Sequence, residues 1–347
     1  LERATGLVNA VLRRLAREGQ NYTLPDIESD PLSHLVHAGS LPVWLAERWL
    51  EQYGAEEAAA LAAIMNEPAP VTVRVNRTKT SRDAILPQLQ EDFPDAHACT
   101  FSPDGIVLGR KGDIGQHKSF VGGFVSPQDE ASQLVVELLD PQAGDRILDT
   151  CSAPGTKSAA IAERLAGKGH VLAVDRHARR LGLVGRGVRR LEVGGVATLE
   201  RDATKSLKDL AEPDGPFDRI LVDAPCSGLG SLRRNPDARW RLRPEDLDSL
   251  STVQRAILES AADVLSPGGS LVYSTCTVTP EENEKVIRGF MATRASWRIA
   301  QRAEAPESLR PLIDDEGFLR ILPHRPESKE MDGFFAVRLV RSQKESL

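Results

Sequence analysis

The chain has 347 residues, of which 44 are lysine or arginine and 50 are aspartate or glutamate, so its formal net charge is -6. This length predicts two or three domains, because domains usually contain about 100–200 residues. The hydrophobic share of 41% and the charged share of 27% exclude a disordered chain. The sequence contains no apolar run near the roughly 18 residues of a membrane-spanning helix, and its first residues do not follow the pattern of a signal peptide.

The cysteine count restricts the class of protein further. The chain has four cysteines with no Cys-x-x-Cys pair, and its seven histidines are dispersed. This pattern excludes a disulfide framework and a zinc site. We therefore expect a cytoplasmic protein with reduced thiols, no bound metal and no membrane contact, and we expect it to be a monomer.

The acidic side chains are unevenly distributed along the chain. Residues 21–70 carry eight acidic side chains and one basic, whereas residues 171–245 carry fifteen basic and eleven acidic. Because electrostatic fields are screened within about 10 Å at physiological salt, a basic face can bind an anionic partner on an acidic protein. The net charge alone therefore does not exclude a nucleic-acid partner.

Hydrophobic periodicity predicts helices at the start of the chain. Apolar residues recur at helical spacing over 1–17, which predicts an amphipathic helix, and we assign 1–20 to it. The polar stretch 21–33 contains Pro25 and Pro31 and is typical of a linker. Helical segments follow from about residue 42, so 21–66 is expected to hold a linker and helices.

The pattern changes near residue 67 to that of a small α+β subdomain, which we place at 67–125. Its alternating, β-branched segment 71–75 predicts a strand. Residues 81–92 predict a helix, and 105–109 and 120–125 predict two more strands.

From residue 126 to residue 347, strands alternate with helices. We predict strands at 146–149, 170–175, 196–199, 217–223 and 270–274, and helices near 156–166, 177–191, 245–265 and 280–291. Such alternation predicts an α/β fold with a mostly parallel sheet and helices on both faces. Two late apolar segments, 318–322 and 334–340, would add antiparallel edge strands.

The segment 148–157 (LDTCSAPGTK) joins an apolar strand to a helix through small residues. Ligands of open α/β sheets bind at the carboxyl ends of strands, where small residues let a ligand approach the backbone. One glycine and one proline replace the several glycines of a dinucleotide or phosphate loop. The turn therefore suits S-adenosylmethionine, which has no phosphate, although an ordinary strand–helix turn explains this segment alone equally well.

Two aspartates follow the next two predicted strands. Asp175 lies twenty residues after Gly155 and can accept both ribose hydroxyls of an adenosine ligand. It can equally cap the helix that begins near His177. Asp202 can accept a hydrogen bond from an adenine amino group, whereas a solvated loop aspartate is its simpler interpretation.

Two cysteines and a third aspartate lie at the ends of the last parallel strands. The segment 222–230 (VDAPCSGLG) ends a strand at Asp223 and continues into a loop with Cys226, and Cys276 follows the fifth strand. Thr279 opens a capping box that predicts a helix start at residue 280. A thiol in a tight strand–helix turn is a candidate reactive thiolate, and a buried structural cysteine is the alternative.

Two thiols, a carboxylate and an adenosine-type ligand suit methyl transfer to carbon-5 of cytosine. Carbon-5 is too weak a nucleophile to take a methyl group until a thiolate has added to carbon-6. A hydrogen bond or a proton at ring nitrogen-3 stabilises the charge that develops. After methyl transfer the carbon-5 proton leaves and the thiolate is expelled, and a second thiol nearby can assist this release.

Three motifs, in this order, resemble signatures of the RNA cytosine carbon-5 methyltransferases of the Sun/NOL1/NOP2 family: DTCSAPGTK (149–157), DAPCSG (223–228) and YSTCT (273–277). The resemblance covers at least 126–347 and implies a Rossmann-like class I S-adenosylmethionine-dependent methyltransferase domain. Segment 67–125 is similar to the small domain that precedes the catalytic domain in that family, which implies RNA binding. Residues 3–17 are similar to the last helix of the NusB-like RNA-binding domain of the bacterial small-subunit rRNA methyltransferase B branch, so we expect 1–20 to be the terminal helix of a truncated domain of this kind.

The resemblance also implies a role for each motif residue. Cys276 would be the nucleophile and Cys226 the thiol that assists release, while Asp223 and Lys157 would face the cytosine. S-adenosylmethionine would contact Asp175 through its ribose, Asp202 through its adenine, and also Asp223, Cys151, Ser152, Ala153, Pro154, Gly155, Thr156 and Lys157. Thr156 stands where many relatives have a second glycine, which loosens the match but changes no catalytic atom.

An arginine-rich segment follows the Cys226 loop. We interpret it as an RNA contact, because arginines bind phosphates and an unstacked base must enter the pocket; its residues are Arg233, Arg234, Arg239, Trp240 and Arg241. A solvated charged surface is the alternative. The partner that the resemblance implies is a single-stranded or loop cytosine of 16S rRNA.

Two other functions stay open at this point. One is a tRNA-specific relative with the same catalytic pair, against which the NusB-like helix argues. The other is a non-catalytic RNA-binding assembly factor that kept the fold, against which the intact Cys276, Cys226 and Asp223 argue.

Overall fold

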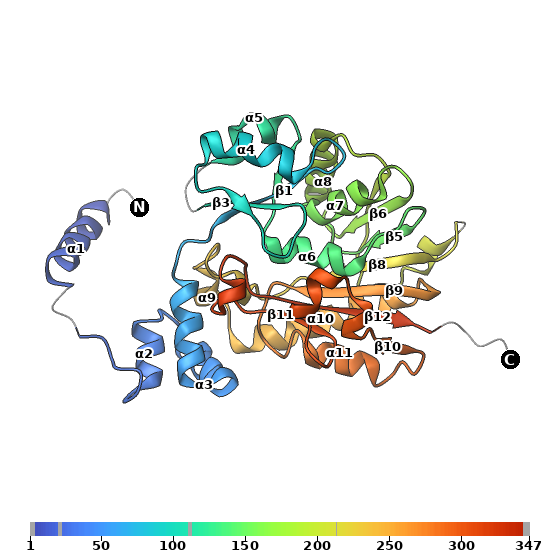
Figure 1. Ribbon diagram of the computed structural model, residues 1–347. Helices are drawn as coiled ribbons and strands as arrows, with labels where there is room; N and C mark the ends of the chain where they lie inside the picture. Colours follow the sequence, from blue (N-terminus) through green and yellow to red (C-terminus); the bar gives the residue numbers. More distant parts are fainter. Residues whose placement is uncertain (1–3, 20–22, 110–112, 213, 343–347) are drawn as a thin grey trace. The chain divides into compact units, whose positions relative to one another are not determined.

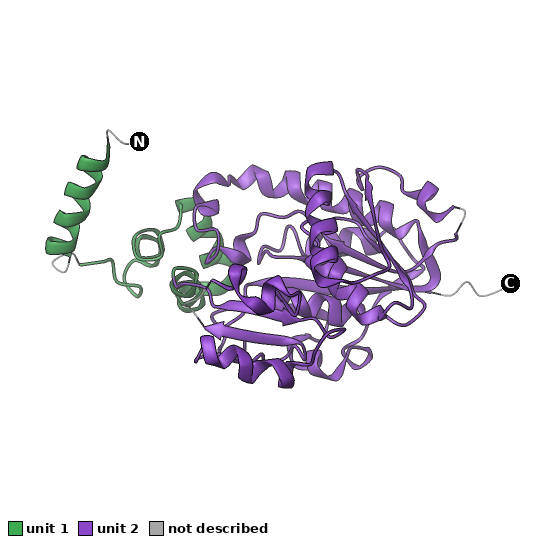
Figure 2. Ribbon diagram, turned by 90° about the horizontal axis from the view of Figure 1, so that it is seen from above, with its two compact units in different colours: residues 1–66 green, residues 67–347 purple. Residues whose placement is uncertain are grey.

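The computed structural model in Figure 1 describes residues 4–19, 23–109, 113–212 and 214–342. It forms two compact units, residues 1–66 and 67–347, which Figure 2 shows in different colours. Across these described ranges, no helix combines the length and the apolar character needed to cross a membrane.

The first unit consists of helices: α1 (Thr5–Glu18), α2 (Pro31–His37) and α3 (Val43–Met65). The predicted helices within 1–17 and 42–66 are confirmed, whereas α2 begins inside the stretch predicted as linker. The Asp30 carboxylate accepts a hydrogen bond from Ser33 N at 3.0 Å and Pro31 occupies the first turn, which explains this helix start. α3 bends at Gly54, whose φ of 77° lies in the left-handed region.

The second unit begins with a four-stranded antiparallel sheet in the order β2-β3-β1-β4. Its elements are β1 (Val71–Val75), α4 (Arg82–Asp92), β2 (His97–Ala98), β3 (Gly105–Gly109), the short helix η3 (Ile114–Gln116), α5 (Lys118–Val121) and β4 (Val125–Pro127). The predicted strand at 120–125 is wrong in most of its length. The His117 side chain caps α5 at Ser119 N, and the turn at Gly122 and Gly123 delays β4 until Val125, which pairs with Val75.

An eight-stranded sheet follows, in the order β10-β12-β9-β8-β5-β6-β7, with β11 paired to β12. Its strands are β5 (Arg146–Asp149), β6 (His170–Asp175), β7 (Val196–Glu200), β8 (Phe217–Asp223), β9 (Leu265–Thr275), β10 (Trp297–Ile299), β11 (Phe318–Ile321) and β12 (Phe334–Arg341). Strands β5 to β9 are parallel, and β10, β11 and β12 add antiparallel pairs.

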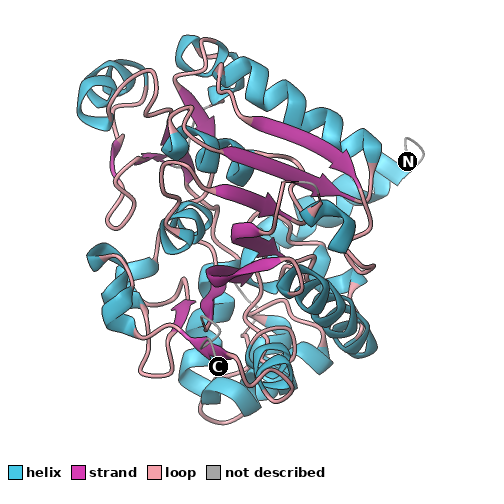
Figure 3. Ribbon diagram, turned by 90° about the vertical axis from the view of Figure 1, so that its right-hand side faces the viewer, coloured by secondary structure: helices cyan, strands magenta, loops and turns pink. Residues whose placement is uncertain are grey.

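Helix α6 (Glu130–Leu139) precedes β5, and the helices between the strands are α7 (Thr156–Leu165), α8 (Ala178–Leu191), α9 (Ala238–Arg241), α10 (Pro244–Ala262) and α11 (Glu284–Met291). Short 3-10 turns are η4 (Lys208–Ala211), η5 (Leu229–Ser231), η6 (Arg302–Glu304), η7 (Glu307–Leu312) and η8 (Pro326–Ser328). Figure 3 shows helices on both sides of the twisted sheet. The predicted alternation of strands and helices is therefore confirmed.

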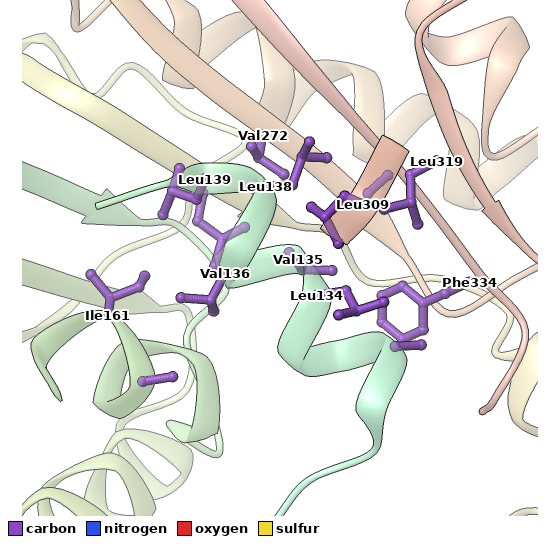
Figure 4. Packing of buried hydrophobic residues seen from close by; sticks show 14 of the residues in the cluster. Leu134, Val135, Val136, Leu138, Leu139, Ile161, Val272, Leu309, Leu319 and Phe334 are labelled. Carbon is purple, nitrogen blue, oxygen red and sulfur yellow. The ribbon is translucent and has the colours of Figure 1, made fainter. Parts of the chain in front are cut away.

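Alternate residues of the strands build two cores. On β9, Val272 packs on the face covered by α6 and α7, whereas Leu271 and Tyr273 pack on the face covered by α10 and α11. Figure 4 shows the first core, in which Leu134 and Val135 of α6 lie close to Phe334. Each fully buried aliphatic side chain of this kind contributes about 1.5–3 kcal/mol.

Two predictions for this part of the chain need correction. β12 is antiparallel as expected, but it lies inside the sheet because β10 pairs with its outer side. The helix predicted from residue 280 begins only at Glu284. Thr279 Oγ1 does bond to the Glu282 carboxylate, at 2.9 Å, but that carboxylate also accepts hydrogen bonds from Ser227 and Gln254, so it does not cap a helix at residue 280.

A buried ion pair connects the small sheet to helix α7, which covers one face of the large sheet. Arg74 of β1 contacts Glu163 of α7 through Nη2–Oε1 at 2.7 Å and Nε–Oε2 at 3.1 Å. The two side chains are 4% and 1% exposed. Arg74 Nη1 also donates to Thr156 O, at 2.9 Å, so the small sheet is fixed to the first turn of α7.

We predict that Arg74→Met lowers the free energy of unfolding by about 3–5 kcal/mol, because it leaves the Glu163 carboxylate buried without its partner. The double variant Arg74→Met/Glu163→Leu should recover part of this loss. Urea denaturation monitored by circular dichroism measures both. Arg255→Met is the control: it removes an exposed ion pair with Glu259 and should lower the free energy of unfolding by under about 1 kcal/mol. The prediction is contradicted if Arg74→Met lowers this free energy no more than Arg255→Met does.

Candidate active site

The parallel strands end around a cavity of about 260 Å³. The strand order reverses at β5, whose neighbours are β6 and β8, and ligands of open α/β sheets bind outside the strand ends at such a point. The cavity is lined by Thr150, Cys151, Ala153, Asp175, Arg176, Arg180, Arg201, Asp202, Ala203, Thr204, Asp223, Ala224, Pro225, Cys226, Val253, Ile257 and Cys276.

The turn between β5 and α7 brings the backbone close to this cavity. Gly155 precedes α7 with a φ of 106°, and a Cβ there would come within 2.8 Å of Val184 Cα, so the position requires glycine. Ser152 N donates to Val174 O at 2.8 Å, which ties the turn to β6. Cys151 and Ala153 line the cavity, and Ser152, Pro154, Gly155, Thr156 and Lys157 shape or support the same turn.

Two of the predicted aspartates line the cavity on the side of β6 and β7. Asp175 Oδ1 accepts a hydrogen bond from His177 N at 2.9 Å, and its Oδ2 lies 3.5 Å from Arg180 Nη1. It thus caps the following turn and faces the cavity at once. Asp202 Oδ1 accepts from Thr204 N and Oγ1 at 3.0 and 2.7 Å, and these bonds lower the pKa of Asp202.

These groups fit S-adenosylmethionine. Two carboxylates provide acceptors for ribose hydroxyls and an amino group, and Val253 and Ile257 of α10 provide an apolar wall of the kind that adenine contacts. The small side chain of Ala153 leaves the backbone accessible.

The two motif cysteines lie together at one end of the cavity. Cys226 Sγ and Cys276 Sγ are 3.3 Å apart, because the loops after the adjacent parallel strands β8 and β9 meet there. Gly230 N donates to Cys276 O at 3.0 Å, and Gly333 N donates to Gly230 O at 2.8 Å. A Cβ at Gly230 would overlap Gly333 O, so these two backbones pass each other in direct contact.

Asp223 connects the cysteines to the cofactor turn. Its Oδ2 accepts from Lys157 Nζ at 2.7 Å and its Oδ1 from Ser274 Oγ at 2.9 Å. Lys157 Nζ also lies 5.4 Å from the centroid of the Phe334 ring. Burial opposes the charged form of Lys157, but the charge and hydrogen bond of Asp223 outweigh it and raise the pKa of Lys157. Lys157 is thus a buried cation beside the thiols.

The three thiols at the strand ends have different environments. The hydrogen bond between the Cys226 and Cys276 sulfurs, together with the Lys157 charge, lowers the pKa of Cys276 against the effect of burial. The same bond and burial raise the pKa of Cys226. Burial also raises the pKa of Cys151. The pair is therefore arranged with Cys276 as the sulfur that ionises first.

The arginine-rich segment divides into buried and exposed residues. Arg233 donates to Lys329 O and Met331 O, and Arg239 is 2% exposed, so neither guanidinium group faces solvent. Arg234 bridges Asp332 at 2.6 Å and Asp129 at 2.8 Å. Trp240 is 59% exposed, and Arg241 carries a 72% exposed side chain that pairs with Asp237 at 3.2 Å, so both side chains face solvent.

The structure also identifies residues that the motifs did not indicate. Val253 and Ile257 line the cavity. They are four residues apart in the predicted helix 245–265, so the sequence placed them on one helix face but gave no sign that this face contacts a ligand. Ser274 belongs to a predicted strand, and only the tertiary fold directs its hydroxyl to Asp223. Cys99, the fourth cysteine, is 6% exposed on the small domain and packs against Gly105.

Comparison with known proteins agrees with this geometry. Residues 136–340 match the family model of the 16S rRNA methyltransferases RsmB/F, and residues 41–115 match the model of the ferredoxin-like domain of RsmF/B-like methyltransferases. The chain is 38% identical over 332 residues to the probable ribosomal RNA small subunit methyltransferase B of Bacillus subtilis, covering 94% of this chain and 72% of that relative. It is 41% identical over 344 residues to ribosomal RNA small subunit methyltransferase B of Pseudomonas putida, covering 97% and 74%.

A solved methyltransferase structure has a similar fold. A methyltransferase homolog protein from Pyrococcus horikoshii is 26% identical with a TM-score of 0.75, covering 90% of this chain and 99% of that one. The predicted fold class is confirmed: a Rossmann-like methyltransferase sheet preceded by a small α+β domain and N-terminal helices. With its cofactor turn, its paired cysteines and these relatives, the chain belongs to the RsmB/F family of 16S rRNA methyltransferases, which use S-adenosylmethionine as cofactor.

Proposed function

We propose that the chain methylates carbon-5 of a cytosine in 16S rRNA through a covalent bond between Cys276 and carbon-6 of that base. The observation that supports this most directly is the Cys226–Cys276 pair, with sulfur atoms 3.3 Å apart, beside Asp223 and the cofactor cavity. Methyl transfer to a nucleophile that is already activated needs no thiol. Two thiols at this position favour a carbon nucleophile that must first be activated by addition.

Cys276 begins the reaction in this proposal. Its thiolate adds to carbon-6, the electron pair of the carbon-5–carbon-6 double bond shifts toward nitrogen-3, and carbon-5 becomes nucleophilic. Lys157 Nζ and Asp223 Oδ2 lie 2.7 Å apart next to Cys276, where Lys157 can donate a hydrogen bond to the ring and Asp223 can accept one from its amino group. A fixed positive charge in a buried site stabilises the negative charge that develops on the ring.

Cys226 completes the reaction. After carbon-5 has received the methyl group, a base removes the carbon-5 proton, the carbon-5–carbon-6 double bond reforms, and the bond to Cys276 breaks. Cys226, held next to Cys276 with a raised pKa, is a thiol that can transfer a proton during this release.

S-adenosylmethionine supplies the methyl group from a sulfonium centre. We assign its adenosine to Asp175, Asp202, Val253 and Ile257, and its methionine end to the turn from Cys151 to Lys157 and to Asp223.

The RNA contact and the choice of RNA are part of the same proposal. We assign RNA contact to the exposed Trp240 and Arg241, because an aromatic ring can stack on an unpaired base and an arginine can bind phosphate. The small domain at 67–125 and the N-terminal segment 1–20, which contains α1, are proposed as further RNA-binding segments. The relatives named small subunit methyltransferase B favour 16S rRNA over tRNA.

We predict that Cys226→Ala accumulates a covalent protein–RNA adduct when it is incubated with the cofactor and 16S rRNA, because addition proceeds and release is slowed. Cys276→Ala should form none. Denaturing gel electrophoresis and mass spectrometry of the modified cytosine measure both. An adduct of equal yield in Cys276→Ala would refute the assignment of the nucleophile.

We predict that Asp202→Ala raises the dissociation constant of S-adenosylmethionine by about 10- to 150-fold, because a hydrogen bond to a charged group contributes about 1.5–3 kcal/mol and about 1.4 kcal/mol is a factor of ten. Isothermal titration calorimetry measures the change. Asp248→Ala removes an exposed carboxylate on α10 and should leave the affinity unchanged. If both variants bind alike, Asp202 does not contact the adenine.

We predict that Lys157→Met raises the pKa of Cys276 and so slows its alkylation by iodoacetamide at pH 7. The substitution removes the cation that favours the thiolate and leaves Asp223, which disfavours it. The rate of alkylation against pH, followed by mass spectrometry of the Cys276 peptide, should shift to higher pH. Lys168→Met removes an exposed lysine and should not shift the curve; a shift to lower pH in Lys157→Met would contradict the prediction.

A further inference from the structure

A buried carboxylate lies between the two cysteine loops. Glu282 is 0% exposed, and its two oxygens accept four hydrogen bonds, all from neutral groups. We propose that Glu282 is a positioning residue that holds the Cys226 loop against the Cys276 loop, so that Cys226 can act on the bond that Cys276 forms. The consequence for catalysis rests on the proposed function, whereas the loop geometry can be tested without it.

Glu282 fixes the Cys226 loop on both sides of the cysteine. Its Oε2 accepts from Ser227 N at 2.8 Å, and its Oε1 accepts from Ser227 Oγ at 2.5 Å. Gln254 Nε2 of α10 donates both to Glu282 Oε2 and to Pro225 O, each at 2.9 Å. The residues directly before and after Cys226 are therefore both connected to this carboxylate.

The same carboxylate is connected to the Cys276 loop. Thr279 Oγ1 donates to Glu282 Oε1 at 2.9 Å, and Ser227 Oγ lies 2.8 Å from Thr277 Oγ1. Tyr273, three residues before Cys276, donates its hydroxyl to Glu282 O at 2.6 Å. One side chain thus joins the loops that follow β8 and β9.

The chemistry of these bonds explains why a carboxylate is used here. An ionised carboxylate offers about four acceptor sites and no donor, and here four donors converge on it. Burial of an ionised group is costly unless hydrogen bonds compensate it. The two cysteine loops are therefore held in the arrangement in which all four hydrogen bonds to Glu282 are made. A capping role alone would need only the bond to the start of the helix, and α11 begins two residues later, at Glu284.

The relative position of the loops is testable through the thiols themselves. Diamide oxidises two adjacent thiols to a disulfide: the sulfurs lose two protons and two electrons, and the diazene is reduced to a hydrazine. The wild-type protein should form the Cys226–Cys276 disulfide readily, since the sulfurs are 3.3 Å apart. Mass spectrometry of the peptides without reduction measures its rate.

Glu282→Ala should form this disulfide at least tenfold more slowly. Removal of the Glu282 charge would by itself make Cys226 easier to ionise and oxidise faster, so a slower rate reports the loss of position. Glu282→Gln should react no more slowly than wild type. Its amide oxygen can accept from Ser227 N and Gln254, and its amide nitrogen can donate to the two hydroxyls.

Glu281→Ala is the matched control, because this neighbouring carboxylate pairs with Lys285 Nζ at 2.8 Å, and the rate of disulfide formation in this variant should stay within about twofold of wild type. Thermal unfolding verifies that each variant is folded. If Glu282→Ala does not fold, Ser227→Ala decides, since it removes one hydroxyl of the network and should slow the disulfide about threefold. The proposal is overturned if folded Glu282→Ala forms the disulfide at the wild-type rate. If Glu282→Ala does not fold, the same result in Ser227→Ala overturns it.

Methylation gives the second readout. Glu282→Ala should lower kcat at least tenfold with a KM for RNA within about twofold, and should accumulate the adduct seen with Cys226→Ala. If Glu282→Ala forms the disulfide slowly and has a lower kcat but accumulates no adduct, Glu282 positions the loops but does not act on the release of the base from Cys276. If Cys226→Ala itself traps no adduct, the proposed covalent mechanism fails, and the disulfide rates still decide whether Glu282 positions the loops.

Discussion

The reversal of strand order at β5 is the constraint on which the site depends. The chain runs from β5 to β6 and β7 on one side and then returns to β8 and β9 on the other side of β5. The helices of the two halves cover different faces of the sheet, and a crevice stays open between them. Carboxylates from the β6 and β7 side and thiols from the β8 and β9 side meet at this crevice. Cofactor cavity and reactive sulfurs are therefore neighbours because of topology, although their residues lie up to 125 positions apart, from Cys151 to Cys276.

Electrostatics then sets the roles within the crevice. A carboxylate and a thiolate close together in a buried site disfavour each other's charge, and Lys157 offsets this by contacting Asp223 directly and acting on Cys276 through space. Ser274 fixes the other oxygen of Asp223, which leaves the Lys157–Asp223 pair with one defined orientation. The hydrogen bond from Arg74 to Thr156 O connects the small sheet to the same site, because Thr156 directly precedes Lys157.

The sequence predicted those features that local pattern determines. Strands such as 217–223 and the turn at 148–157 were found because apolar runs end in small and polar residues, and the three aspartates and two thiols line the cavity as expected. Features set by distant contacts were not found. Arg233 and Arg239 look like surface charges until the fold buries them, and Glu282 looks like a helix cap until Ser227 is brought to it. β12 looked like an edge because β10, which covers it, has only three residues.

The backbone contact between Gly230 and Gly333 has a consequence for how the protein is made. Gly230 N donates to Cys276 O, and Gly230 O accepts from Gly333 N, which lies more than fifty residues after Cys276 in the chain. A ribosome synthesises Cys226 and Cys276 before it reaches Gly333, so both cysteines are part of the nascent chain before the hydrogen bond from Gly333 N to Gly230 O can form. This contact of the loop that follows Cys226 is therefore made late in synthesis.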